Sequence, residues 1–156
     1  MIAKEIHKLA QKLRKAGKHI TIETAGTVSP DDIDCDLASI SPKLSNSKPD
    51  ERLSKEWQEK HEKFRIQPEV LQEWVDDYPY QLKFVVQSSD DLIEIQDLLS
   101  KISGSISPEK VLLMPEGIDA ATIRGRDESL IEVCKRYGYR YCNRLHIEIF
   151  GNKRGT

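Results

Sequence analysis

Apolar residues recur along the chain with two spacings, one typical of helices and one typical of strands. Repeats of three to four residues predict amphipathic helices, and short apolar runs between turn residues predict buried strands. Helices are expected from Ile2 to Leu13, within the polar stretch 44–67, from Pro68 to Val75, from Leu92 to Ile102 and over 127–137. Strands are expected at residues 19–23, 36–41, 82–86, 111–114 and 146–150.

Residues at the expected ends of these helices support the assignment. Pro68 suits the first turn of a helix, and Gly17 and Gly138 suit the left-handed position that ends one. The Ser-Asp-Asp sequence at 89–91 suits a helix start.

Strands that alternate with amphipathic helices indicate an α/β fold with a parallel sheet and right-handed crossovers. With 156 residues, the chain is expected to form one domain over 1–156 with a core of its own. A helix comes before the first expected strand. The strand at 19–23 is therefore predicted to lie exposed at an edge of the sheet.

Composition and charge exclude several classes of protein. A formal net charge of -2 gives no overall field that would attract nucleic acid or an anionic membrane. No apolar run approaches a bilayer span, and the amino terminus alternates apolar residues with lysines, unlike a signal peptide. Three scattered cysteines do not form a disulfide framework, which predicts a protein of the reducing cytoplasm.

The first expected helix is strongly basic. Such a helix can bind RNA or lie on a membrane. The solvated outer face of a crossover helix is the better interpretation, because the apolar stripe is narrow and no aromatic residue anchors it. The basic residues are Lys4, Lys8, Lys12, Arg14, Lys15 and Lys18.

Candidate chemistry lies where the expected parallel strands end. Ligands of α/β folds bind beyond the carboxyl ends of the strands, which selects residues 23–27 (ETAGT), 41–43 (SPK), 114–117 (MPEG) and whatever follows Phe150. A carboxylate, a lysine and glycines there can bind a polar, charged small molecule. Each segment alone is also an ordinary turn sequence, and only their shared position favours a site.

The three cysteines do not have the pattern of metal ligands. Cys134 shares a helical face with Leu130 and Tyr137, which predicts a buried thiol. Cys35 and Cys142 have no partner at the spacing of zinc or iron–sulfur sites, and the four histidines are scattered. These residues alone do not identify a reaction.

Four segments, taken in order, resemble one family. Residues 19–27 (HITIETAGT) are similar to the ETxGT strand of the 7-carboxy-7-deazaguanine synthases, and residues 36–43 (DLASISPK) to their SPK segment. Residues 81–86 (QLKFVV) resemble their next strand, and residues 141–156 (YCNRLHIEIFGNKRGT) resemble a carboxy terminus found in one branch. On these matches the chain is identified as a member of that family.

The resemblance implies an incomplete (β/α) barrel of the radical S-adenosylmethionine (SAM) type and a carbon–nitrogen lyase activity. In this family a 4Fe-4S cluster cleaves SAM, and the radical starts the ring contraction of 6-carboxy-5,6,7,8-tetrahydropterin with loss of ammonia, assisted by Mg2+. The product, 7-carboxy-7-deazaguanine, leads to queuosine and related 7-deazapurines. The expected partners are the pterin substrate and SAM, with a possible homodimer and with neither nucleic acid nor membrane.

The resemblance also implies roles for individual residues. Glu23 would face the pterin as a catalytic carboxylate that accepts hydrogen bonds or handles a proton. His146 matches a substrate-facing histidine, and Thr156 matches a last residue whose terminal carboxylate reaches the pterin in some members. The positions that match SAM-contacting segments are Ser41, Pro42, Lys43, Leu113, Met114, Pro115 and Glu116.

The sequence departs from the family at its amino-terminal side. The family's cluster cysteines, a substrate-binding arginine, the magnesium ligand and a Gly-Gly-Glu-Pro strand end have no counterpart, and Met1 falls just after that strand end. The chain is therefore expected to be the carboxy-terminal part of the barrel, without its amino-terminal strands and inactive alone. The alternative is a non-catalytic domain that binds a pterin or nucleotide, or that assembles with a partner through the strand at 19–23.

Overall fold

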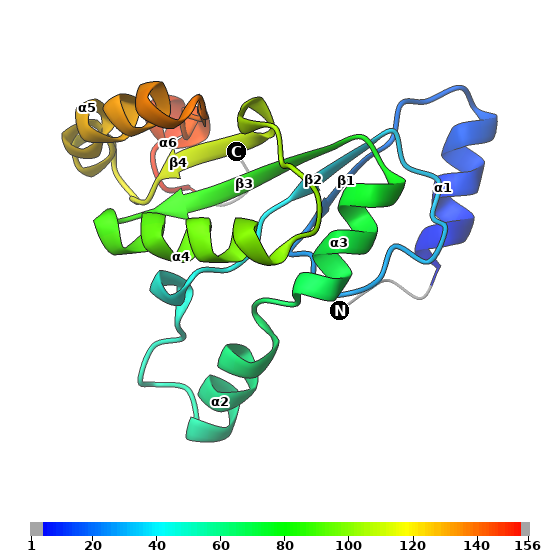
Figure 1. The fold of residues 1–156 in the computed structure, drawn as a ribbon, viewed down its shortest axis with the longest axis horizontal. Coiled ribbons are helices and arrows are strands. Elements are labelled where there is room, and N and C mark those ends of the chain that lie inside the picture. Colours follow the sequence, from blue (N-terminus) through cyan, green and yellow to red (C-terminus); the bar gives the residue numbers. More distant parts are fainter. Residues whose placement is uncertain (1–4, 154–156) are drawn as a thin grey trace.

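The structure, a computed structural model, describes residues 5–153 as one α/β unit (Figure 1). The helices are α1 (Ile6–Lys15), α2 (Lys55–Phe64), α3 (Pro68–Asp77), α4 (Ser89–Lys101), α5 (Ala120–Tyr137) and α6 (Leu145–Phe150). The strands are β1 (Thr21–Thr24), β2 (Leu37–Ile40), β3 (Tyr80–Val86), β4 (Val111–Pro115) and β5 (Arg140–Tyr141).

The five strands form one parallel sheet in the order β1-β2-β3-β4-β5. This confirms the predicted α/β class with a parallel sheet. Within the described residues β1 is an edge strand, as expected, and its residues Thr21 and Glu23 are exposed. Helices α3 and α4 pack in front of the sheet in Figure 1, whereas α2 lies away from it.

The two faces of the sheet have opposite character because side chains alternate along each strand. Ile40, Leu82 and Phe84 are completely buried in the core, together with Leu71 of α3 and Ile95 of α4. The opposite face of the same strands carries polar side chains. Those are Glu23 on β1, Ser39 on β2, and Gln81 and Lys83 on β3.

Helix α4 shows how the sequence pattern is converted into packing. Its predicted apolar stripe buries Ile95 and Leu98. The N-cap is Ser88, one residue before the expected cap, and the Asp91 carboxylate accepts a hydrogen bond from the Ser88 backbone N–H at 3.0 Å. A side chain three residues into the helix thus satisfies a backbone donor at its start.

The prediction of a strand at 146–150 was wrong, because these residues form helix α6. The last strand is instead β5, which pairs with β4 through Arg140 opposite Leu112 and Tyr141 opposite Leu113. The alternating sequence HIEIF fits a strand. However, in the structure it buries only Ile147.

Two other helices differ from expectation. Helix α5 begins at Ala120 rather than near Asp127, because the Asp119 side chain accepts a hydrogen bond from the Thr122 N–H at 2.8 Å and caps it. Helix α1 buries only Ala10, and Leu9 of its predicted apolar stripe is 55% exposed. Across residues 5–153, no helix combines the length and apolar character needed to cross a membrane.

Candidate functional site

Residues at the carboxyl ends of β1, β2 and β4, with Lys83 of β3 and the segment that begins α6, line an open cavity of about 440 Å³. Five of the residues that the sequence singled out, contributed by β1, the loop after β2, β4 and α6, lie in its wall: Glu23, Ser41, Lys43, Met114 and His146. The remaining lining residues are Thr24, Ala25, Ser39, Lys83 and Arg144. The structure therefore brings together residues from segments that the rule for parallel strands selected.

The polar face of the sheet forms the floor of this cavity. Glu23 lies opposite Ser39 in the strand register, and Ser39 lies opposite Gln81. The Gln81 Nε2 donates a hydrogen bond to Ser39 Oγ at 3.0 Å, which satisfies the buried hydroxyl. The Lys83 Nζ lies 3.7 Å from Glu23 Oε1.

Glu23 is well placed to meet a ligand. Its side chain is 77% exposed, and its only ion-pair partner among the described residues is the long contact to Lys83. An ionised carboxylate in this position can accept hydrogen bonds from the N–H groups of a heterocycle.

Other predicted site residues lie away from the cavity. Leu113 and Pro115 are fully buried in the core, and Pro42 is buried as well, so any contact they make with a ligand would be through the backbone. The Glu116 carboxylate instead pairs with Arg126 of α5 at 2.5 Å. Thr156 lies outside the described residues.

The loop that carries Lys43 is fixed by an arginine at the end of α2. The Arg65 Nη1 donates to the Lys43 backbone carbonyl at 3.0 Å and also pairs with the Glu94 carboxylate of α4. The other oxygen of Glu94 accepts from the Ser45 N–H at 2.8 Å. Hydrogen bonds to Glu62 and then to Glu94 raise the pKa of Arg65, so the clamp stays charged.

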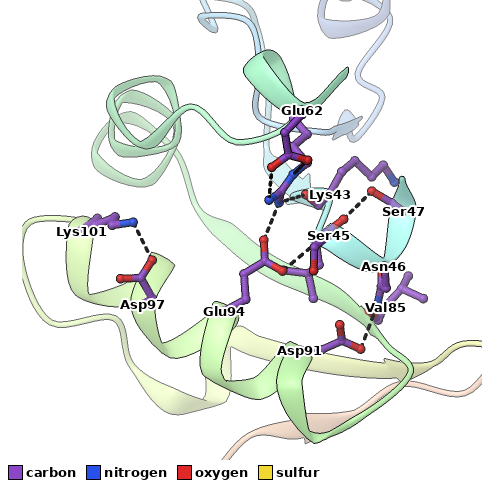
Figure 2. A network of polar contacts seen from close by, with 12 residues as sticks. Lys43, Ser45, Asn46, Ser47, Glu62, Val85, Asp91, Glu94, Asp97 and Lys101 are labelled. Atoms are coloured by element: carbon purple, nitrogen blue, oxygen red, sulfur yellow. Dashed lines mark hydrogen bonds and ion pairs between the residues drawn. The ribbon is translucent and has the colours of Figure 1, made fainter. Parts of the chain in front are cut away.

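A second set of contacts holds the same loop against the start of α4 (Figure 2). The Asn46 Nδ2 donates to the Val85 carbonyl and to Asp91 Oδ2, both at 2.9 Å. That Asp91 oxygen also accepts from the backbone N–H groups of Gln87 at 2.6 Å and Ser88 at 3.0 Å. Asp91 is only 4% exposed, so the loop is attached through a buried carboxylate, one oxygen of which accepts all three of these bonds.

Sequence reasoning missed two cations in the cavity wall, Lys83 and Arg144. Lys83 could have been found from its position between the buried residues Leu82 and Phe84, which points it to the opposite face of β3. Arg144 lies immediately before α6, a helix that the sequence predicted as a strand. Its Nη1 donates to the Gly117 carbonyl at 2.8 Å.

The cysteines lie in different parts of the fold. Cys134 is buried in α5, as predicted, and burial raises the pKa of its thiol. Cys35 comes before β2 and Cys142 follows β5, so these two lie at opposite ends of a parallel sheet. All three thiols are free, and among residues 5–153 no three His, Cys, Asp or Glu side chains are grouped closely enough to hold a metal ion.

Comparison with curated proteins identifies relatives that extend over the whole chain. A 7-carboxy-7-deazaguanine synthase of Rhodopirellula baltica is 40% identical over 157 residues, which cover 100% of this chain and 60% of the relative. The chain is a member of the 7-carboxy-7-deazaguanine synthase family. A synthase of Halobacterium salinarum is 39% identical over 152 residues, or 92% of this chain and 59% of the relative. No protein-family model and no solved structure matches the chain.

The membership of the synthase family confirms the resemblance drawn from four short segments. The chain spans about three-fifths of the length of these synthases. All four segments contribute to the cavity wall, through Glu23, Lys43, Lys83 and His146. The family-like parts of the sequence and the cavity are therefore the same region of the molecule.

Proposed function

We propose that this chain is the part of a 7-carboxy-7-deazaguanine synthase that positions SAM and a carboxylated pterin, within a partial barrel of the radical SAM type. The observation that supports this most strongly is the common cavity. It is lined by Glu23, Ser41, Lys43, Met114 and His146, which come from four separate segments of a chain related to these synthases.

The cavity has groups that fit SAM. SAM carries an amino-acid carboxylate and ribose hydroxyls, and Lys43 has no carboxylate partner among residues 5–153. An unpaired ammonium and the nearby Ser41 hydroxyl are suitable partners for these groups. Bound SAM would supply the radical chemistry of the family, while these residues would bind and orient it.

On the pterin side, we assign Glu23 to the ring N–H groups. Its exposed carboxylate accepts hydrogen bonds, and Lys83 at 3.7 Å limits the directions it can take. His146 lies on the same cavity wall, and its imidazole nitrogens can form hydrogen bonds to the ring. Both roles require a substrate held over the polar face of the sheet.

The 4Fe-4S cluster does not fit the thiols of this chain. Such clusters need several thiolates around one centre, and Cys35, Cys134 and Cys142 lie in separate parts of the fold. No grouping of acidic side chains among residues 5–153 fits Mg2+ either. We therefore propose that the 156 residues alone do not complete the reaction. The three free thiols support a further part of the proposal, namely that the protein acts in the reducing cytoplasm.

Replacing Lys43 by alanine tests the proposed SAM site. The 156-residue chain is expected to bind SAM saturably in isothermal titration calorimetry. Lys43→Ala should weaken this binding roughly tenfold, the factor expected from one lost hydrogen bond to a charged group. Lys18→Ala, an exposed lysine outside the cavity, serves as the matched control. Absence of SAM binding, or equal losses in both variants, would contradict the proposed site.

Anaerobic reconstitution with iron and sulfide tests the statement about the cluster. Because the three cysteines do not converge, the reconstituted and desalted chain should show no visible absorbance from a 4Fe-4S cluster and no stoichiometric iron. A cluster bound to this chain would show that its thiols can reach one another, and the proposal that the chain lacks a cluster would then be wrong.

A second candidate function is a non-catalytic binding or assembly role. The exposed edge strand β1 supports it, because unpaired backbone groups at an edge can add a strand from another chain. The partner could be a second copy of this chain or an amino-terminal part of such a synthase. Sedimentation velocity distinguishes this assembly role from the proposed synthase function. If the purified chain stays monomeric both alone and when mixed with an amino-terminal part of such a synthase, it does not assemble through β1.

A further inference from the structure

The cavity contains more positive than negative charge. Lys43, Lys83 and Arg144 face it together with one carboxylate, that of Glu23. Glu23 is already engaged by Lys83 at 3.7 Å. Lys43 and Arg144 have no carboxylate partner among residues 5–153, so two positive side chains remain available to an anionic ligand.

Arg144 is held in place but its hydrogen-bonding capacity is only partly used. Its Nη1 donates to the Gly117 carbonyl at 2.8 Å, which fixes the guanidinium against the turn after β4. Its Nε is buried from solvent and has no hydrogen-bond partner in the described structure. A buried donor without a partner is unfavourable, and a guanidinium presents its remaining donors in a planar fork that matches a carboxylate.

The position of Arg144 relative to Lys43 separates two anionic subsites. Lys43 comes from the loop after β2, which Arg65 fixes from the α2 side. Arg144 comes from the segment after β5 and lies beside His146, two residues further along. The sheet order places β3 and β4 between these two segments. A carboxylate at Arg144 therefore lies near His146, which together with Glu23 across the polar floor of the cavity we assign to the heterocycle.

We propose that Arg144 binds the carboxylate of the heterocyclic ligand and makes the cavity selective for a carboxylated over an uncarboxylated ring. This inference rests on the proposed pterin-binding function and adds to it a residue that sets specificity. Lys43 binds the amino-acid carboxylate of SAM, so the two cations bind different ligands.

Two stable probes separate the carboxylate from the ring: 6-carboxypterin and unsubstituted pterin. Their binding to the 156-residue chain can be followed by titrating pterin fluorescence. The chain should bind 6-carboxypterin at least about tenfold more tightly than pterin, as expected for a hydrogen-bonded charge pair. Arg144→Gln should abolish that preference by weakening only 6-carboxypterin binding. Arg144→Lys, which keeps the charge but not the fork, should restore only part of it.

Arg140→Gln is the matched control, because Arg140 is an exposed arginine four residues earlier that does not line the cavity. Circular dichroism and thermal unfolding establish that each variant is folded. If Arg144→Gln keeps the wild-type preference, the inference about Arg144 is overturned while pterin binding stands. If the wild-type chain binds both probes equally, the inference is again wrong. If it binds neither, the proposed pterin site falls as well.

Discussion

Replacing Gly26 by alanine should lower the free energy of unfolding by about 2–5 kcal/mol, one of the largest losses expected for a single methyl group in this chain. Gly26 has a φ of +69°, a conformation that L-residues adopt at a cost. A Cβ at this position would lie 2.2 Å from Leu71 Cδ2 and 2.9 Å from Ile40 Cγ2, both in the core. Urea unfolding followed by circular dichroism measures the loss.

The consequence for the site follows from the position of Gly26. It lies in the turn between Thr24 and Thr27, directly after the strand that carries Glu23. The Gly26 N–H donates to Thr24 Oγ1 at 3.1 Å, and the turn packs closely on Leu71 of α3. A side chain here would push the turn off α3 and displace the edge of the cavity, so ligand binding should weaken along with stability.

Gly17→Ala separates the two contributions to this effect. Gly17 has a φ of +66°, nearly that of Gly26, but a Cβ there meets no atom within 4 Å. Its substitution should therefore cost only the conformational part, about 1–2 kcal/mol. Equal losses in the two variants would mean that Leu71 moves aside without cost, and that close packing at Gly26 contributes nothing.

The parts of the fold that the sequence predicted are those in which local periodicity and burial agree. In α4, Ile95 and Leu98 recur at helical spacing and both are buried. In β3, Leu82, Phe84 and Val86 alternate with less buried residues, and all three lie in the core. In such segments the burial of one face decides the secondary structure, so the pattern is sufficient.

The prediction of a strand at 146–150 failed because burial of one face does not determine the secondary structure of this segment. Only Ile147 is buried, and Leu145, Ile149 and Phe150 remain exposed. The last strand of the sheet, which this segment was expected to form, consists of Arg140 and Tyr141 instead. Two residues of pairing give almost no periodic signal, so this choice depends on tertiary contacts that a local pattern does not contain.

The same distinction applies to the cavity. Glu23, Ser41 and Met114 could be predicted because each follows or ends a parallel strand, and the carboxyl ends of such strands coincide. Arg144 could not, because its position depends on α6. The contact between Asn46 and Asp91 joins residues 45 positions apart and has no local signature beyond a Ser-x-x-Asp helix start.

Asp91→Ala is expected to cost about 3 kcal/mol of stability, since it removes a helix cap and leaves buried donors unpaired. The donors are the N–H groups of Gln87 and Ser88 and the Asn46 side-chain amide, all of which share one Asp91 oxygen. Thermal unfolding measures this loss. The neighbouring Asp90→Ala serves as the control, because Asp90 is exposed and accepts none of these bonds.

A second effect of Asp91→Ala distinguishes a positioning role from a purely structural one. Asn46 lies three residues after Lys43 in the loop that Figure 2 shows attached to α4. Without Asp91 the loop keeps the Arg65 and Glu94 contacts and the hydrogen bond from Asn46 to the Val85 carbonyl, but it loses the bond to the start of α4. SAM binding by the fully folded fraction should therefore weaken several-fold. Asp91→Asn retains one acceptor oxygen, so its thermal stability and its SAM affinity should lie between those of the wild type and of Asp91→Ala. If stability falls but SAM affinity of the folded protein does not change, the loop is positioned without Asp91.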